Sequence, residues 1–198
     1  MIVLECGCDE VGRGSAIGEI YAGAVILDKE HGIKGLIDSK KLTAGQREAL
    51  SEEIKAKSLA WSIGTATLEE VKMLNVHHAS LLAMKRAIDG LLVKPEKVYV
   101  DGRHVPRLDF SDILLEAVIK GDEKIEAISA ASIIAKVSRD KTMLEYHELY
   151  PQYGIKRHKG YVTKEHLEAL TKYGPCPIHR LSYAPIRKIM NGESVSFR

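Results

Sequence analysis

The stretch Gly7-Cys8-Asp9-Glu10-Val11-Gly12-Arg13-Gly14 joins a short apolar segment to two acids and a glycine loop. The apolar residues 2–8 predict a buried strand, and residues 18–27, rich in Val, Ile and Tyr, predict a second one. The glycines between them predict a loop over residues 12–18. An acid that directly follows a buried strand is costly unless it reaches solvent, a partner or a metal. The stretch therefore predicts a sheet with a polar site at one end.

Strand and helix signals alternate along the rest of the chain. Capping boxes that begin at Thr43 and Thr67 predict two helix starts, and Asn75 predicts the cap of a longer helix. The remaining predicted strands cover residues 61–66, 98–100 and 114–119, and the remaining predicted helices cover residues 129–148 and 163–173. This order predicts an α/β fold with a central mixed sheet flanked by helices, followed by a C-terminal helical extension.

Composition suits one ordinary globular domain. The chain has 198 residues, of which 45% are hydrophobic and 28% charged, so it can bury a full core without disulfides. The net charge of +2 is nearly balanced, but residues 136–188 hold eleven Lys and Arg against five Asp and Glu. This basic third is a candidate phosphate-binding surface, with a solvated helical face as the alternative.

Cysteine content and hydropathy predict where the protein works. The three cysteines are Cys6, Cys8 and Cys176, an odd number that indicates reduced thiols in a cytoplasmic protein. No run of about 18 apolar residues is present, so we expect no membrane span. The first residues lack the basic start of a signal peptide.

Carboxylates at the ends of predicted strands carry the chemical signal. Asp9 and Glu10 follow the first strand, Asp101 ends the strand at 98–100, and Asp122 comes shortly after residues 114–119. Acids brought together raise one another's pKa and need cations, and carboxylate oxygens suit Mg²⁺ or Mn²⁺. Each acid taken alone is more simply an ordinary cap or turn residue. Four further acids stay open as ligands on this reasoning: Asp38, Asp109, Asp112 and Asp140.

Gly12-Arg13-Gly14 adds a second feature to the acidic pair. Glycine lets backbone N–H groups approach a ligand closely, and an arginine between glycines can fork to phosphate. The spacing matches neither a Walker A loop nor a dinucleotide fingerprint. A plain hairpin loop with a surface arginine is the alternative.

Longer segments form a more specific pattern that runs in order from Gly7 to Pro185, nearly the whole chain. They are Gly7-Cys8-Asp9-Glu10-Val11-Gly12-Arg13-Gly14, Asp38-Ser39-Lys40-Lys41-Leu42, Val100-Asp101-Gly102, Lys120-Gly121-Asp122, the block from Ala130 to Asp140, His158-Lys159-Gly160-Tyr161 and His179-Arg180. The block at 130–140 and the Asp-Glu-x-Gly-Arg-Gly block are the most specific. Together these segments closely resemble the type 2 ribonucleases H, and their spacing is similar to that of bacterial ribonuclease HII.

The resemblance implies a ribonuclease H-like fold and a nuclease activity. The implied enzyme is an endonuclease that hydrolyses the RNA strand of RNA/DNA hybrids and incises at ribonucleotides embedded in duplex DNA. It would use Mn²⁺ or Mg²⁺, with two ions during catalysis, and leave 5′-phosphate and 3′-hydroxyl ends. The four metal-site acids of the family map onto Asp9, Glu10, Asp101 and Asp122. We expect residues 1–142 to form the catalytic domain, residues 143–198 to pack on it as the helical extension, and the protein to be a monomer.

The resemblance also assigns substrate contacts. Gly12, Arg13 and Gly14 map onto the loop that senses the ribonucleotide 2′-hydroxyl, the group that separates RNA from DNA. Tyr161 maps onto a tyrosine that stacks under the sugar after the cut ribonucleotide. Lys40 and Lys41 resemble phosphate contacts, and Asp140 is treated as secondary.

Two departures from the family pattern predict local differences. The family continues Gly-Arg-Gly with Pro-Leu-Ala-Gly-Pro, whereas this chain has Ser15-Ala16-Ile17-Gly18-Glu19, so we expect a looser loop. The family's Gly-Tyr-Gly is here Gly160-Tyr161-Val162. If the second glycine needs a positive φ, Val162 would shift the tyrosine.

Three other functions remain as alternatives. One is a different nuclease or recombinase on the same fold, against which the Gly-Arg-Gly loop argues. Another is a non-catalytic module that binds RNA/DNA hybrids, which four intact acids disfavour. The last is a zinc protein built on Cys6, Cys8, Cys176 and His179, although Cys6 and Cys8 lack the two-residue gap of zinc knuckles.

Overall fold

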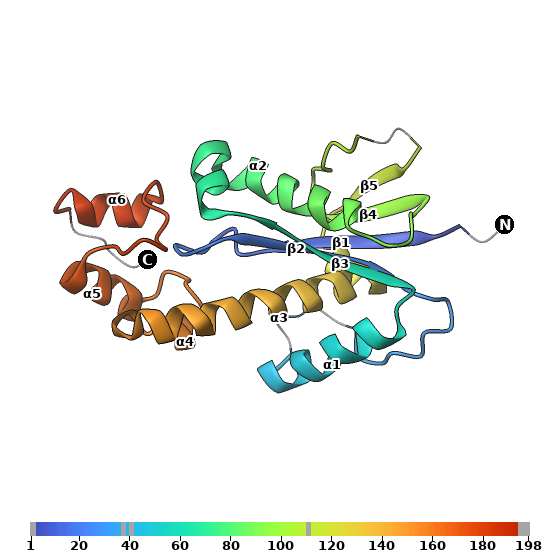
Figure 1. Cartoon of the computed structure of the whole chain (residues 1–198), viewed down its shortest axis with the longest axis horizontal. Coiled ribbons are helices and arrows are strands. Elements are labelled where there is room, and N and C mark those ends of the chain that lie inside the picture. The colour runs from blue at the N-terminus through green and yellow to red at the C-terminus, as the bar shows by residue number, and fades with distance from the viewer. Residues whose placement is uncertain (1–2, 37–38, 40–41, 110–111, 194–198) are drawn as a thin grey trace.

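The computed structural model describes residues 3–36, 39, 42–109 and 112–193, and a five-stranded mixed sheet lies at its centre (Figure 1). The strands are β1 (Glu5–Val11), β2 (Ile20–Ile26), β3 (Ala60–Ala66), β4 (Lys97–Asp101) and β5 (Leu114–Val118), in the order β3-β2-β1-β4-β5. β1 is antiparallel to β2, and β2 to β3, whereas β1, β4 and β5 run parallel. The carboxyl ends of these three parallel strands therefore meet at one edge, and the predicted α/β class is confirmed.

Helices cover both faces of the sheet (Figure 1). They are α1 (Ala44–Lys57), α2 (Leu68–Asp89), α3 (Glu126–Leu149), α4 (Ile155–His158), α5 (Lys164–Tyr173) and α6 (Ala184–Met190). α2 lies on one face over a core that includes Cys6 and Cys8, while α1 and α3 lie on the other face around Val25 and Ile134. Within the described residues, no helix is long and apolar enough to span a membrane.

The predicted helix starts at Thr43, Thr67 and Asn75 are confirmed. Thr43 and Thr67 each form a complete capping box with the residue three positions later. Asn75 has a φ of 66° and interrupts α2, and its Oδ1 accepts the backbone N–H groups of His77 and His78. It therefore caps the long second part of α2, as the sequence predicted.

The first strand extends further than the sequence predicted. Asp9 and Glu10 do not follow β1 but belong to it, paired with Gly23 and Ala22 of β2. α3 packs directly on this strand at Gly7, which has no side chain. A Cβ at this position would collide with the backbone of Ala127, so the close packing depends on glycine. The close approach places the polar residues of α3 beside Asp9.

The C-terminal helices form a core of their own at the end of α3 (Figure 1). This core contains Met143, Leu170 and Ile186, and it also receives Ala16 and Ile17 from the loop after β1. The predicted boundary at residue 142 falls inside α3, which continues unbroken to Leu149. The short helices α4 and α6 were not predicted.

Candidate active site

A cleft at the carboxyl edge of β1, β4 and β5 gathers most of the predicted site residues. Asp9 and Glu10 come from β1, Asp101 ends β4, and Asp122 lies in the turn of 3-10 helix η2 (Gly121–Glu123) after β5. The same cleft is lined by Gly12, Arg13, Gly14 and Tyr161. Lys40 and Lys41 lie outside the described residues.

Asp9 is the most enclosed of the four acids, with only 6% of its surface exposed. Its Oδ1 accepts the backbone N–H of Glu10 at 2.7 Å, and the hydroxyl of Ser132 on α3 hydrogen-bonds its carboxylate. Burial raises the pKa of Asp9 well above its usual value, and the charges of Glu10 and Asp101 raise it further. The protein thus holds a carboxyl group where negative charge is unfavourable.

Glu10 and Asp101 each have a fixed partner. Burial also raises the pKa of Glu10, while Arg13 opposes that rise through an ion pair of 3.1 Å between its Nη1 and Oε1 of Glu10. Oδ1 of Asp101 accepts the backbone N–H of Gly121 at 2.7 Å. This bond fastens the turn that carries Asp122 to the end of β4.

The donor chemistry of the cleft suits a hard divalent cation. In the part of the chain that is described, no three Asp, Glu, His or Cys side chains converge closely enough to form a complete metal cage. Mg²⁺ and related ions need few protein carboxylates, because water and substrate phosphate supply the remaining oxygens. A cation beside Asp9 would also reverse the rise in its pKa. The residues present therefore fit such an ion.

The Gly12-Arg13-Gly14 loop is held by Arg180, which lies far along the chain. The buried Arg180 side chain donates hydrogen bonds to the carbonyl oxygens of five residues of this loop and its continuation: Gly12, Arg13, Ser15, Gly18 and Glu19. Ala16 N–H also donates to the Gly160 carbonyl at 2.9 Å. These bonds hold the backbone of the segment that lacks the family's prolines.

Tyr161 lines the same cleft as the acids, with 36% of its surface exposed. The Nζ of Lys136 and the guanidinium of Arg139 lie 5.7 and 5.5 Å from the centre of its ring. Gly160 has a φ of 81°, but Val162 does not have a positive φ and packs on the C-terminal core. The condition under which Val162 would shift the tyrosine, a positive φ at that position, is therefore not met.

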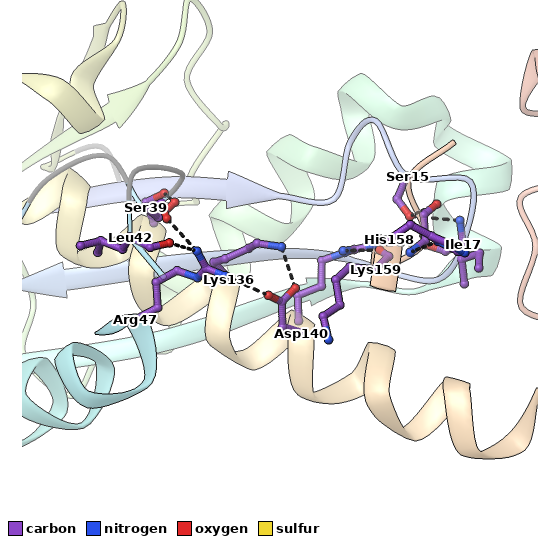
Figure 2. Close-up of polar contacts among 12 residues, drawn as sticks. Ser15, Ile17, Ser39, Leu42, Arg47, Lys136, Asp140, His158 and Lys159 are labelled. Carbon is purple, nitrogen blue, oxygen red and sulfur yellow. Dashed lines mark hydrogen bonds and ion pairs between the residues drawn. The ribbon is translucent and has the colours of Figure 1, made fainter. Parts of the chain in front are cut away.

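Residues that the sequence analysis left without a role complete the surroundings. Ser39, Ser132 and Lys136 line the cleft, and the hydroxyls of Ser39 and Ser132 lie 3.1 Å apart. Lys136 pairs with Asp140 at 2.6 Å, and Arg47 lies 3.8 Å from the other oxygen of Asp140 (Figure 2). Ser132, Lys136 and Asp140 recur at intervals of four residues, so helical periodicity alone could have placed them on one face of α3.

The cysteines lie in two different cores. Cys6 and Cys8 are buried between the sheet and α2, where burial raises the pKa of the Cys6 thiol to about 12. Cys176 packs beside His179 in the C-terminal core. The four ligands of the zinc alternative are therefore not brought together.

Comparisons with known proteins agree along nearly the whole chain. The family model for Ribonuclease HII matches residues 6–186. A Ribonuclease HII of Desulforamulus reducens is 64% identical over 192 residues, covering 97% of this chain and 96% of that protein. The ribonuclease H2 of Pyrococcus horikoshii OT3 superposes with a TM-score of 0.81 at 30% identity, covering 95% of this chain and 97% of its own. Bst-RNase HIII in complex with Mn²⁺ shares the fold at a TM-score of 0.70 and 18% identity, covering 96% of this chain and 70% of its own.

Proposed function

The chain belongs to the ribonuclease HII family, and from that premise we propose that the cleft at the carboxyl edge of β1, β4 and β5 is its active site. Family membership confirms the activity predicted from the sequence, which is cleavage of RNA in RNA/DNA hybrids and at ribonucleotides embedded in DNA. The observation that supports this location is Asp9, a buried carboxyl among like charges at a strand end.

In this proposal Asp9, Glu10, Asp101 and Asp122 bind the divalent ions of a metal-dependent family. Mn²⁺ and Mg²⁺ both suit the carboxylates, and two such ions would supply an activated water and stabilise the leaving oxygen. Ser132 orients Asp9, the Gly121 N–H orients Asp101, and Arg13 orients Glu10. These partners leave the acids in fixed positions before substrate arrives.

Substrate selection is proposed for the Gly12-Arg13-Gly14 loop and Tyr161, which line the same cleft. The backbone of Gly12, Arg13 and Gly14 would contact the 2′-hydroxyl, since Arg13 pairs with Glu10 and a Cβ at Gly14 would lie 3.8 Å from the Tyr161 ring. The exposed part of the Tyr161 ring would stack on the sugar that follows the cut. Lys40 and Lys41 remain proposed phosphate contacts on sequence alone.

Residues 143–198 are proposed to support the catalytic domain rather than to act separately. Ala16 and Ile17 pack into the C-terminal core, and Arg180 holds the loop that precedes them. We further propose that the protein acts as a monomer in the cytoplasm.

Matched duplexes that contain zero, one or four ribonucleotides test this function. Incision is expected on the 5′ side of a ribonucleotide in the second and third duplexes only, with divalent ions required. Cutting of the all-DNA duplex would instead support a different nuclease on the same fold. Titration of Mg²⁺ and Mn²⁺ on wild-type protein and Asp101→Asn then separates metal binding from cleavage, because the variant should bind the ions more weakly.

A further inference from the structure

Three histidines form a continuous buried chain beneath Tyr161. His158 ends α4, His166 lies in α5, and His179 lies in the segment between α5 and α6. The rings of His158 and His166 stack with centroids 4.4 Å apart, and Nε2 of His166 lies 3.2 Å from Nε2 of His179. His166 is fully buried and the other two are nearly so. The resemblance to the nuclease family gave His166 no role.

The hydrogen-bond partners of these rings determine where their protons lie. Nδ1 of His166 faces the carbonyl oxygen of Tyr161 at 3.0 Å, and a carbonyl only accepts, so Nδ1 carries the proton. Nε2 of neutral His166 is then an acceptor, and Nε2 of His179 must donate to it. Nδ1 of His179 is left unprotonated and accepts the Cys176 N–H at 3.0 Å. The Cys176 carbonyl oxygen, 3.2 Å from the same nitrogen, instead accepts the His179 backbone N–H at 2.9 Å. Donation therefore runs in one direction, from Cys176 to Tyr161.

His158 holds the other side of the tyrosine. Its Nε2 donates to the Tyr153 carbonyl at 2.7 Å, so its Nδ1 is free to accept the Gly160 N–H at 3.2 Å. The Tyr161 N–H in turn donates to the His158 carbonyl at 2.9 Å. The two stacked imidazoles thus hold the N–H of Gly160 and the carbonyl oxygen of Tyr161, while the backbone carbonyl of His158 holds the Tyr161 N–H.

Burial keeps these rings neutral. Burial, helped by the charge of the neighbouring His158, lowers the pKa of both His166 and His179 to about 4. Around His158, Arg157 and His147 add positive charge that opposes its protonation. Proton uptake by His166 would place two N–H groups face to face at the contact with His179.

We propose that His166 is a positioning residue for Tyr161 and that His179 selects the tautomer in which His166 acts. The proposal rests on the proposed function, in which the Tyr161 ring stacks on substrate. Lys136 and Arg139 flank the ring, and Tyr161 follows Gly160 at a positive φ, so the contacts of its peptide groups act together with those of the ring in setting its direction. If the Tyr161 ring is already held in its binding orientation, less side-chain entropy is lost when the substrate binds.

The tautomers can be observed directly by ¹⁵N NMR of histidine-labelled protein at pH 7. We expect His166 as the Nδ1–H form, which is the minor form in water, and His158 and His179 as the Nε2–H form. Finding His166 as Nε2–H, or doubly protonated, would overturn the proposal without bearing on the cleavage activity.

Cleavage of a duplex with one ribonucleotide tests the consequence. His166→Leu removes the donor and should lower kcat/KM about ten-fold, whereas the amide of His166→Asn stands in for Nδ1–H and should restore most of it. Ile186→Val, in the same core, controls for lost packing and should cleave normally. If His166→Leu does not fold, the same comparison can be made at the next ring. His179→Leu, which removes the donor to His166, is then compared with His179→Gln, which keeps one.

A double-mutant cycle separates this inference from the function on which it rests. If His166 acts through the tyrosine, His166→Leu should have no further effect in a Tyr161→Ala background. A full additional loss there would overturn the positioning role while leaving the tyrosine in the site. Normal cleavage by Tyr161→Ala alone would instead remove Tyr161 from the proposed function, and the inference with it.

Discussion

The guanidinium of Arg180 donates to the carbonyl oxygen of Gly12 at 2.8 Å, across 168 residues of sequence. Further bonds from the same group reach Ser15 at 2.8 Å and Glu19 at 3.1 Å. Burial lowers the pKa of Arg180 only to about 10, so it remains a cation at neutral pH. One charged side chain thus gives the loop beside the acids its shape.

Replacing Arg180 should therefore affect stability and cleavage together. Arg180→Met leaves several buried carbonyl groups without donors and should cost roughly 2–4 kcal/mol of unfolding free energy. Arg180→Lys keeps the charge but loses the planar fork, so it should lie between Met and wild type. Urea denaturation measures the stability of both variants, with Arg187→Met, at an exposed position, as the control. An Arg180→Met protein as stable as wild type would show that the loop holds itself.

The three aspartates among the proposed site acids should each be required for turnover. Asp9→Asn, Asp101→Asn and Asp122→Asn should each lower kcat by at least about 100-fold with the fold intact. Asp109→Asn, on an exposed side chain outside the cleft, is the matched control and should cleave normally. Circular dichroism checks the fold. Near-normal turnover by Asp101→Asn at saturating Mg²⁺ would remove that residue from the site.

Stability should depend on pH through Asp9. The pKa of Asp9 is higher in the folded than in the unfolded protein, so the folded protein keeps the Asp9 proton to a higher pH. The stability that this proton contributes is therefore lost as pH rises from about 4 towards neutrality. Without divalent ions, Asp9→Asn should therefore gain more stability over wild type at pH 7 than at pH 5. Adding Mg²⁺ should stabilise wild type and reduce the difference. Urea denaturation at both pH values, with EDTA and with Mg²⁺, measures it.

Truncation of Tyr161 should affect cleavage more than stability, because the ring is partly exposed. Tyr161→Phe should keep most activity, and Tyr161→Ala should lose about ten-fold if stacking contributes ~1–3 kcal/mol. A core aromatic would instead cost about 3 kcal/mol of stability on truncation. A thermal melt and a cleavage assay on one preparation distinguish the two, and a large stability loss with normal cleavage would contradict the site role.

Basic side chains beside the cleft should set the salt dependence of binding. Lys141 and Lys159 line a groove between α1 and α3 together with Arg47. Lys141→Ala and Lys159→Ala should each reduce the slope of log affinity against log salt by about one, if each lysine contacts a phosphate. Lys72→Ala, on α2 across the sheet, should leave the slope unchanged. If all three variants kept the wild-type slope, Lys141 and Lys159 would belong to a solvated face that contacts no phosphate.

The sheet and its acids could be predicted because their signals are local. Alternating apolar runs ended by Asp101 and by Lys120-Gly121-Asp122 set the strand ends, and side-chain capping set the helix starts at Thr43 and Thr67. The end of β1 was misplaced, because the pairing of Asp9 and Glu10 with β2 depends on the partner strand.

Arg180 and the histidine chain could not be predicted for the opposite reason. Arg180 and His166 lie in a basic stretch that composition assigns to a surface, yet both are buried against segments distant in sequence. Helices α4 and α6 have only four and seven residues, too few for a periodic signal. The prediction for Val162 came from the glycine that the family pattern has at this position. In this chain the positive φ lies before the tyrosine, at Gly160, and not after it.

The bond between Arg180 and Gly12 also fixes an order of events during synthesis. Ribosomes build chains from the N-terminus at roughly 5–20 residues per second, so Arg180 follows Gly12 by on the order of ten seconds. By then all five strands, which end at Val118, have been made, acids included. A nascent chain therefore carries its carboxylates well before the loop beside them has a shape. In the proposed function, this loop would therefore distinguish RNA from DNA only after Arg180 has left the ribosome.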